Sequence, residues 1–317
     1  MPFLHRLFQG YTPYFCTEPS PTPSTMETTQ KKLITVEALI NAPVEHVWTC
    51  WTAPTHIMRW NQASADWHTT RAENDLRPGG KFLSRMEARD GSFGFDFEGT
   101  YQEVIPHEQI TYVLDDGRQV SISFKGEAGN TRVVERFEAE STHSVEMQQQ
   151  GWQAILDNFK QHVENPSTLD SLHFEIEIQA PAERVYRCML EDETYRLWTE
   201  AFSAGSHYKG RWEKGAKLLF LGPDQEGNLG GMVSRIKELV PNRFVSIEHL
   251  GLYQNGQEIT SGPEVEKWAG ALENYTFRQT GGSTLLLIDT DTNAEYKEMF
   301  SGIWPRALQK LKSLCEA

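Results

Sequence analysis

The sequence is short of positive charge and of long apolar runs, and each shortage excludes a class of protein. Its 317 residues hold 30 Lys and Arg against 44 Asp and Glu, a formal net charge of −14. A nucleic-acid binder needs a clustered basic surface, and an anionic membrane surface repels a chain of this sign. No run approaches the roughly 18 apolar residues of a membrane span. We therefore expect neither nucleic acid nor membrane as a partner.

Cysteine is scarce as well, and the motifs of metal and nucleophile chemistry are missing. The four cysteines are scattered, with no CxxC pair, at Cys16, Cys50, Cys188 and Cys315. This usage fits a reducing cytoplasm, and we expect Cys50 and Cys188 to be small buried hydrophobes within helices. There is no HExxH motif, and the glycine doublets at 79–80 and 230–231 need only turn geometry. We predict no metal site, no cofactor and no assignable catalytic residue.

The first 32 residues have the composition of a tail. Pro, Ser and Thr dominate positions 18–29, and no continuous apolar segment precedes a small-residue cleavage site. We therefore expect residues 1–32 to be a disordered N-terminal extension without a signal peptide. A further hypothesis is that translation starts at Met26 and that the preceding residues come from a misassigned start.

A repeated stretch organises the rest of the chain. The stretch 40–61 reads INAPVEHVWTCWTAPTHIMRWN, and the stretch 178–199 reads IQAPAERVYRCMLEDETYRLWT. They align without a gap, and the spacing from proline to tryptophan is 17 residues in both, from Pro43 to Trp60 and from Pro181 to Trp198. A repeat at this distance indicates two homologous domains, since solenoid periods are far shorter.

The patterns around each copy predict the element order β-α-α-β(about six)-α. An alternating strand precedes each proline, which suits the first turn of a helix. Short β-prone segments with Gly and Pro turns follow, and an amphipathic helix ends each copy. The predicted domains are 33–164 and 172–317, with a linker at 165–171. We expect residues 253–267 of the second copy to form a longer loop.

Several motifs of the first copy, in this order, resemble a known superfamily. They are APxxxVW at 42–48, GGKF at 79–82, EGTYQEVIP at 98–106 and GWQAILDNF at 151–159. Together they resemble the START-like, or SRPBCC, helix-grip superfamily, and within it the activator of heat-shock-protein-90 ATPase homologue-like group. The resemblance implies an α+β fold of two tandem helix-grip domains, each a curved antiparallel sheet (β-α-α-β6-α) wrapped around a long C-terminal helix. The second copy matches more distantly.

A sheet that curves around one helix can leave a cavity, and such pockets are mainly apolar with a few polar groups. The candidate lining residues of the first cavity are Trp60, Trp67, Phe82, Met86, Phe95, Phe97, Tyr112 and Trp152, with the polar anchors His68, His143, Asp66 and Arg85. The candidates in the second copy are Trp198, Tyr208, Phe220, His249, Tyr253, Trp268, Tyr275 and Trp304, with Glu273 as a further polar anchor. The alternative for each aromatic residue is a place in a closed core.

Three functions follow from the pattern and the resemblance. The first is non-enzymatic binding of a small hydrophobic or amphipathic ligand between sheet and helix. The second, implied by the name of the group, is a chaperone cofactor or protein-interaction module with a chaperone as partner. The third is a cyclase- or dehydratase-like enzyme that uses a His or Tyr of the cavity as general acid or base.

Overall fold

The computed structural model describes residues 32–165, 169–224 and 226–317. Apart from Lys32, the predicted N-terminal extension and its alternative start at Met26 lie outside the described residues. The chain divides into two compact units, one that ends at Asn165 and one that follows it. No helix of the described ranges combines the length and the apolar character needed to cross a membrane.

The first unit has the predicted element order. Its elements are β1 (Leu33–Ile40), α2 (Val44–Thr52), α3 (Pro54–Trp60), β2 (Trp67–Asn74), β3 (Lys81–Ala88), β4 (Gly94–Ile105), β5 (Gln109–Leu114), β6 (Gln119–Glu127), β7 (Asn130–Glu138) and α4 (Val145–Glu164). The seven strands form one sheet in the order β1-β7-β6-β5-β4-β3-β2, and all neighbours are antiparallel. Strands β2 to β7 form a meander, and the first strand, β1, pairs with the last, β7.

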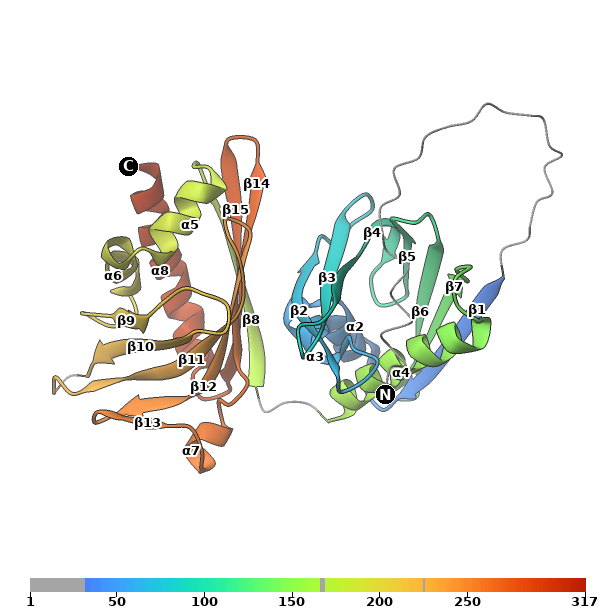
Figure 1. Cartoon of the computed structure of the whole chain (residues 1–317), viewed down its shortest axis with the longest axis horizontal. Coiled ribbons are helices and arrows are strands. Elements are labelled where there is room, and N and C mark those ends of the chain that lie inside the picture. Colours follow the sequence, from blue (N-terminus) through green and yellow to red (C-terminus); the bar gives the residue numbers. More distant parts are fainter. Residues whose placement is uncertain (1–31, 166–168, 225) are drawn as a thin grey trace. The chain divides into compact units, whose positions relative to one another are not determined.

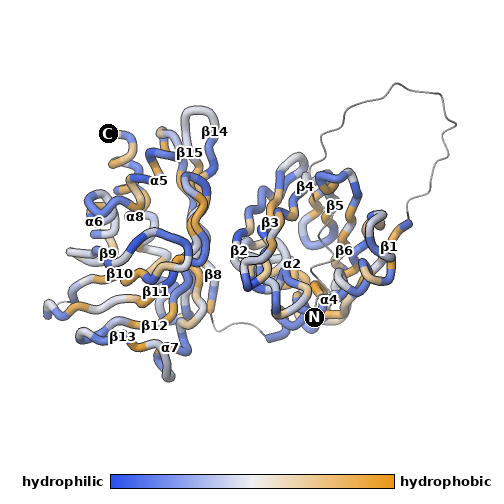
Figure 2. Tube along the Cα trace, in the orientation of Figure 1, coloured by the Kyte–Doolittle hydropathy of each residue, from blue (hydrophilic) through white to orange (hydrophobic). Residues whose placement is uncertain are grey.

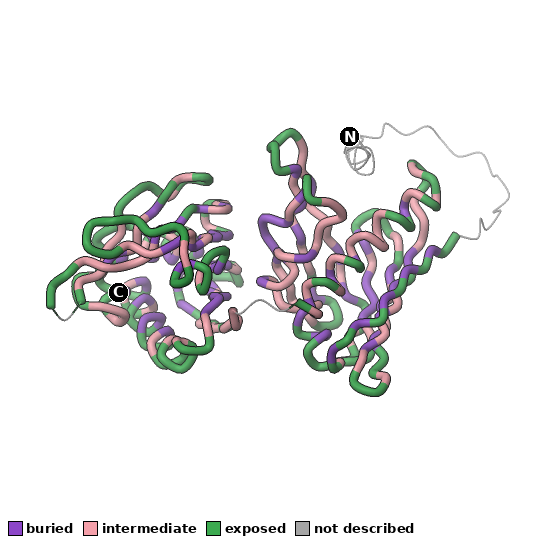
Figure 3. Tube along the Cα trace, turned by 90° about the horizontal axis from the view of Figure 1, so that it is seen from below, coloured by how far each residue is buried: buried purple, intermediate pink, exposed green. Residues whose placement is uncertain are grey.

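Alternation along the strands gives each sheet one buried face. In β1 every second side chain is buried, from Ile34 to Ile40, and Figure 3 shows the same alternation of exposed and buried positions. Figure 2 shows hydrophobic and hydrophilic stretches alternating along other strands. A period of two places all apolar side chains on the same side of the sheet, which a helix then has to cover.

Helix α4 covers that face in the first unit. The Ser144 hydroxyl accepts a hydrogen bond from the Met147 N–H (3.1 Å) and so caps its first turn. Leu156, Phe159 and Val163 are buried against the core, while the opposite side of the helix is polar. In Figure 1 the long helices α4 and α8 each lie against the sheet of their own unit.

The second unit repeats this architecture with more irregular strands. Its elements are β8 (Leu169–Ile178), α5 (Ala182–Leu190), α6 (Asp192–Thr199), β9 (His207–Gly210), β10 (Lys217–Pro223), β11 (Leu229–Val240), β12 (Phe244–Gln254), β13 (Gln257–Ile259), α7 (Pro263–Glu266), β14 (Leu272–Thr280), β15 (Ser283–Asn293) and α8 (Lys297–Glu316). The sheet order is β8-β15-β14-β12-β11-β10-β9, and β13 pairs with β12. Both units thus have the α+β helix-grip arrangement that the resemblance implies.

Two expectations about the second copy need correction. Strand β8 begins at Leu169, inside the predicted linker, because β15 is long enough to pair with residues 169–171. The Ser171 hydroxyl also donates a hydrogen bond to the Asp291 carboxylate (2.8 Å). The expected loop at 253–267 is partly ordered, since it contains β13 and the single-turn helix α7.

The repeated tryptophans fix the two short helices of each unit. The indole N–H of Trp60 donates a hydrogen bond to the Cys50 carbonyl (2.9 Å), and Trp198 does the same to the Met189 carbonyl (3.0 Å). Both acceptors lie in the last turn of the preceding helix, where carbonyls have no partner within the helix. The constant proline-to-tryptophan spacing therefore serves to cap the first helix with a side chain from the second.

This indole hydrogen bond makes a measurable contribution to stability. We expect Trp198→Phe to lower the free energy of unfolding by about 1–3 kcal/mol, because it leaves the buried Met189 carbonyl unsatisfied and removes part of a fully packed side chain. The measurement is urea denaturation of the full chain. The neighbouring Leu197 is 52% exposed, so Leu197→Ala should cost less than about 0.5 kcal/mol. Equal losses for the two variants would contradict the capping role.

Candidate functional site

The first unit encloses a cavity of about 760 Å³ between its sheet and α4. Pockets that hold small molecules commonly have volumes of about 300–1,000 Å³. Strands β2, β3, β4, β5 and β7, the β5–β6 turn, the short helices and α4 all contribute to its wall. The lining residues are Trp51, Ile57, Trp60, Asn61, Glu73, Phe82, Ser84, Met86, Phe95, Phe97, Tyr101, Tyr112, Asp116, Arg118, Glu135, Ala139, Glu140, Ser141, Thr142, His143, Gln148, Gly151, Trp152 and Ile155.

Aromatic rings form much of the wall and hold one another in place. Trp152 of α4 stacks on Phe137 of β7, with ring centroids 3.9 Å apart, and meets Phe97 of β4 edge-on at 6.1 Å. Phe82 and Tyr112 make an edge contact at 4.7 Å. Rings held by such contacts are rigid, so this part of the cavity offers a preformed apolar surface.

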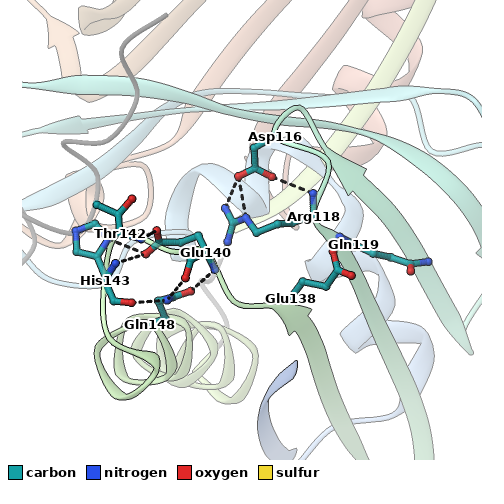
Figure 4. A network of polar contacts seen from close by, with 8 residues as sticks. All are labelled: Asp116, Arg118, Gln119, Glu138, Glu140, Thr142, His143 and Gln148. Carbon is teal, nitrogen blue, oxygen red and sulfur yellow. Dashed lines mark hydrogen bonds and ion pairs between the residues drawn. The ribbon is translucent and has the colours of Figure 1, made fainter. Parts of the chain in front are cut away.

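A polar network occupies the segments that lead into α4 and the β5–β6 turn (Figure 4). The Arg118 guanidinium pairs with the Asp116 carboxylate at 2.8 Å and is 14% exposed. On the other side Glu140 accepts hydrogen bonds from the backbone and ring of His143 (both 2.8 Å). The side-chain amide of Gln148 donates to the carbonyls of Glu140 (3.1 Å) and His143 (2.9 Å), which ties this loop to α4.

A buried carboxyl group lies within the lining. Glu135 of β7 is 5% exposed, and burial raises its pKa to about 8. The side chain is therefore mostly protonated at pH 7 and carries a hydrogen-bond donor. The buried hydroxyl of Tyr112 also has a raised pKa, chiefly through burial and secondly through the charge of Glu135. The cavity thus contains two neutral polar groups that can each donate or accept a hydrogen bond.

Most of the candidates predicted in the first copy line this cavity. The lining includes Trp60, Phe82, Met86, Phe95, Phe97, Tyr112 and Trp152, with His143 as a polar group. Trp67 does not belong to it: its ring packs on Phe93 and Phe95 in a small cluster, from which Phe95 and Met86 reach the cavity wall. The three other predicted anchors, His68, Asp66 and Arg85, are also absent from the lining.

Strand geometry explains two of these errors. Arg85 alternates with Ser84 and Met86 on β3, so it lies on the opposite face and pairs with Glu87 (2.9 Å) and Asp96 (3.4 Å). His68 lies on β2, opposite Glu87 in the register of the sheet, so it shares the outer face with Glu87 and Arg85.

In the second copy three of the candidates belong to the main hydrophobic core. Trp198, Tyr275 and Trp304 are each 2% exposed, so protein atoms cover them on almost every side. The Tyr208 hydroxyl donates to the Leu190 carbonyl (2.9 Å), and its ring packs on Tyr195. Phe220 packs against the same core beside Trp212, whereas Tyr253 lies in the pairing of β12 with β13 and Trp268 contacts Tyr296.

The predicted polar anchors of the second copy do meet. His249 is 7% exposed and lies 2.9 Å from the Ser234 hydroxyl and 3.7 Å from the Glu273 carboxylate. Tyr275 donates its hydroxyl to the same Glu273. Since Ser234 is fully buried, this cluster is inside the domain and satisfies its own polar groups.

Larger and less polar side chains distinguish the second core from the first. The gap-free repeat places Tyr195 where the first copy has Ile57. The final helices, aligned at Trp152 and Trp304, place Phe300 where the first copy has Gln148. In the sheets, the matching pairing with the first strand of each unit places buried Ile288 at the position of Glu135. These replacements add aromatic volume and remove polar groups.

Sequence reasoning missed the most polar part of the cavity. Glu135 carried a usable signal, since it occupies an inward position of β7 between Val133 and Phe137. A carboxylate on the apolar face of a strand is rare unless it has a role. Arg118 and Glu140 carried no signal, because charged residues in turns are usually solvated.

Comparisons with known proteins agree with the duplication. The family model described as Activator of Hsp90 ATPase homolog 1-like protein matches residues 41–164 and 179–316. The AHSA1-like protein from Aeromonas hydrophila is 49% identical over 42% of this chain and 93% of its own, with a TM-score of 0.41. Chr148 from Cytophaga hutchinsonii is 48% identical over 42% and 92%, with a TM-score of 0.38. The di-domain ARO/CYC StfQ from the steffimycin biosynthetic pathway is 12% identical over 89% and 98%, with a TM-score of 0.45. A search of curated proteins found no match.

Glu135 makes stability depend on pH. Its pKa is about 8 in the folded chain against an ordinary value of 4.5, so between these values the folded state binds more protons than the unfolded state. Stability is therefore highest below pH 4.5 with respect to this group and falls as the pH rises through 8. Each pKa unit corresponds to about 1.4 kcal/mol, so the loss is on the order of a few kcal/mol.

Glu135→Gln should abolish this slope and stabilise the chain at neutral pH. Urea denaturation between pH 5 and pH 9 measures it. The control is Glu138→Gln at the end of the same strand, whose carboxylate accepts a hydrogen bond from the Gln119 N–H (3.0 Å) and should not show a stabilising effect. An unchanged slope in Glu135→Gln would contradict the buried neutral carboxyl.

Proposed function

The chain belongs to the Activator of Hsp90 ATPase homolog 1-like family, and from this premise we propose that its first domain binds a small amphipathic molecule with an uncharged or cationic polar end. The observation that carries the proposal is the cavity of about 760 Å³ with rigid aromatic walls and a few polar groups. The second domain, in which Tyr195, Phe300 and Ile288 replace Ile57, Gln148 and Glu135, has a structural role in this proposal. We also propose, on the basis of composition, that the protein works in the cytoplasm.

The apolar wall supplies the affinity. Aromatic and aliphatic groups of a ligand would replace water next to Phe82, Phe97 and Trp152, and burial of apolar area is worth roughly 25 cal/mol per Å². Because the rings already contact one another, little side-chain freedom is lost when a ligand enters.

The charges of the lining residues favour a ligand whose polar end is uncharged or cationic. Among the described residues, four carboxyl groups line the cavity, those of Glu73, Asp116, Glu135 and Glu140, against the single guanidinium of Arg118. Arg118 is already paired with Asp116, so it offers an anionic ligand little uncompensated positive charge. A carboxylate on the ligand would meet like charges on the cavity wall, which disfavours its binding. An alcohol or an amine avoids this penalty.

A series of twelve-carbon ligands tests the function and the choice of polar end. Dodecanol, dodecylamine and dodecanoate are titrated into the full chain below their micellar concentrations, with calorimetry and quenching of tryptophan fluorescence as readouts. We expect the alcohol and the amine to bind at least tenfold more tightly than the carboxylate, a difference of about 1.4 kcal/mol. Tightest binding of the carboxylate would refute the selection by charge. Absence of binding for this series and for an aromatic panel would refute the function itself.

Two substitutions of serine by phenylalanine test where the ligand binds. Ser84 is buried and lines the cavity from β3, so Ser84→Phe should fill part of the space and weaken binding at least tenfold. Ser121 alternates with buried Val120 and Ile122 on β6 and lies on the outer face, so Ser121→Phe adds the same side chain outside the cavity. Binding should be unchanged in Ser121→Phe. Equal affinities of the two variants would place the ligand elsewhere.

Glu135 favours a second candidate function, general acid catalysis. A carboxyl group with a pKa of about 8 is protonated at neutral pH, and a bound oxygen within reach could take its proton. Mass spectrometry of each bound ligand after incubation would detect conversion. In that case Glu135→Gln should keep ligand affinity and lose turnover. Bound ligands that are always recovered unchanged leave binding as the function.

A further inference from the structure

Three helices of the first domain bring a thiol and two imidazoles together outside the cavity wall. Cys50 comes from α2, His56 from α3 and His162 from α4, and one potential ligand atom of each lies within 4.8 Å of the others. The His56 Nδ1 and His162 Nε2 atoms are 2.8 Å apart. A fourth ligand is near, because the His46 ring lies one turn before Cys50 on α2, with its Nε2 3.7 Å from the Cys50 Sγ.

The spacing suits a tetrahedral metal ion after a small adjustment. Zinc binds thiolate sulfur at about 2.3 Å and imidazole nitrogen at about 2.0–2.1 Å, which puts neighbouring ligand atoms about 3.3–3.6 Å apart. The two imidazole nitrogens would have to separate slightly and the thiol to move inward. His46 is exposed and therefore has room to turn toward the centre. All four ligands are on helices, so the adjustment requires only side-chain rotations and small shifts.

The chemistry of the cluster fits cation binding. The His56 Nδ1 and His162 Nε2 atoms share a hydrogen bond, so both rings present a nitrogen to the same point, and an ion placed there would replace that hydrogen bond. Neutral imidazole nitrogen and thiolate sulfur are both zinc ligands, and metal binding would release the thiol proton of Cys50.

The second copy provides an internal comparison. It keeps the cysteine, Cys188, at the repeat position of Cys50 but has Arg184 and Thr194 where the first copy has His46 and His56. Its final helix has Leu314 at the position of His162. All three histidines are thus confined to the copy that contains the cavity, and the repeat architecture does not require them.

We propose that Cys50, His56 and His162, with His46 as fourth ligand, bind a borderline-soft divalent transition-metal ion of the Zn²⁺ class. Zinc favours a mixed set of thiolate and imidazole ligands, whereas hard cations such as Mg²⁺ and Ca²⁺ select oxygen. The ion would link α2, α3 and α4, the three helices that carry Trp51, Ile57, Trp60 and Trp152 of the cavity wall. The site is thus a structural one and does not depend on the proposed ligand.

Metal titration of the chelator-treated full chain tests the site. We expect one Zn²⁺ per chain with a dissociation constant in the micromolar range or tighter, measured by competition with a chromophoric chelator. Co²⁺ should give a thiolate-to-metal charge-transfer band in the near ultraviolet. Zn²⁺ should also raise the melting temperature, since it binds the folded state alone.

Variants taken from the second copy sharpen this test. His162→Leu and His56→Thr install the second-copy residues, and each should weaken Zn²⁺ binding at least tenfold. Cys50→Ser should abolish the Co²⁺ charge-transfer band, whereas Cys188→Ser should leave band and affinity unchanged. Circular dichroism confirms that each variant is folded. The proposal is overturned by sub-stoichiometric Zn²⁺, by a band that survives Cys50→Ser, or by equal affinities of His162→Leu and the unaltered chain.

Discussion

Each sheet of this protein has one apolar face, and a single long helix has to cover it. A helix of 20 residues is narrower than a curved sheet of seven strands, so side chains must fill the remaining space or leave it open. The two copies solve the same problem in opposite ways. In the second, Tyr195 and Phe300 complete a dense aromatic core. In the first, the shorter Ile57 and the polar Gln148 border an open cavity.

The cavity lowers the stability of the first domain, and the packing around it must offset this loss. Unfilled space forfeits the contacts that a close-packed interior gains, and Glu135 is held away from water. The stacked pair of Phe137 and Trp152 and the indole hydrogen bond of Trp60 stabilise the frame around that space. Functional sites are often destabilising by themselves and are supported by rigid surroundings. The cavity of the first domain has both properties.

The fold was largely predictable because its signals are local. The alternation around Ile34, the prolines before the short helices and the stripe of the final helix each depend on residues close in sequence. The cavity was predictable in part, since inward aromatic residues of the strands also follow an alternation. Whether a domain contains an open cavity was not predictable. Trp152 and Trp304 occupy equivalent positions in the two copies, and the side chains around each tryptophan determine how much space remains. The prediction for Trp67 was wrong for the same reason: its residue type fits a cavity, but it lies behind Phe95, the member of its cluster that reaches the lining.

The thiol–imidazole cluster shows why long-range constellations escape sequence motifs. Cys50 and His162 are 112 positions apart, and only the packing of α2 and α4 joins them. Their position also links the two proposals for the first domain. The carbonyl of Cys50 accepts the hydrogen bond of Trp60, a cavity residue, while its thiol belongs to the cluster. On these proposals an ion that fixes the thiol also restrains this carbonyl and the ring that depends on it. Any effect of the ion on ligand affinity must then be matched by an equal effect of the ligand on ion affinity, because coupling free energies are reciprocal.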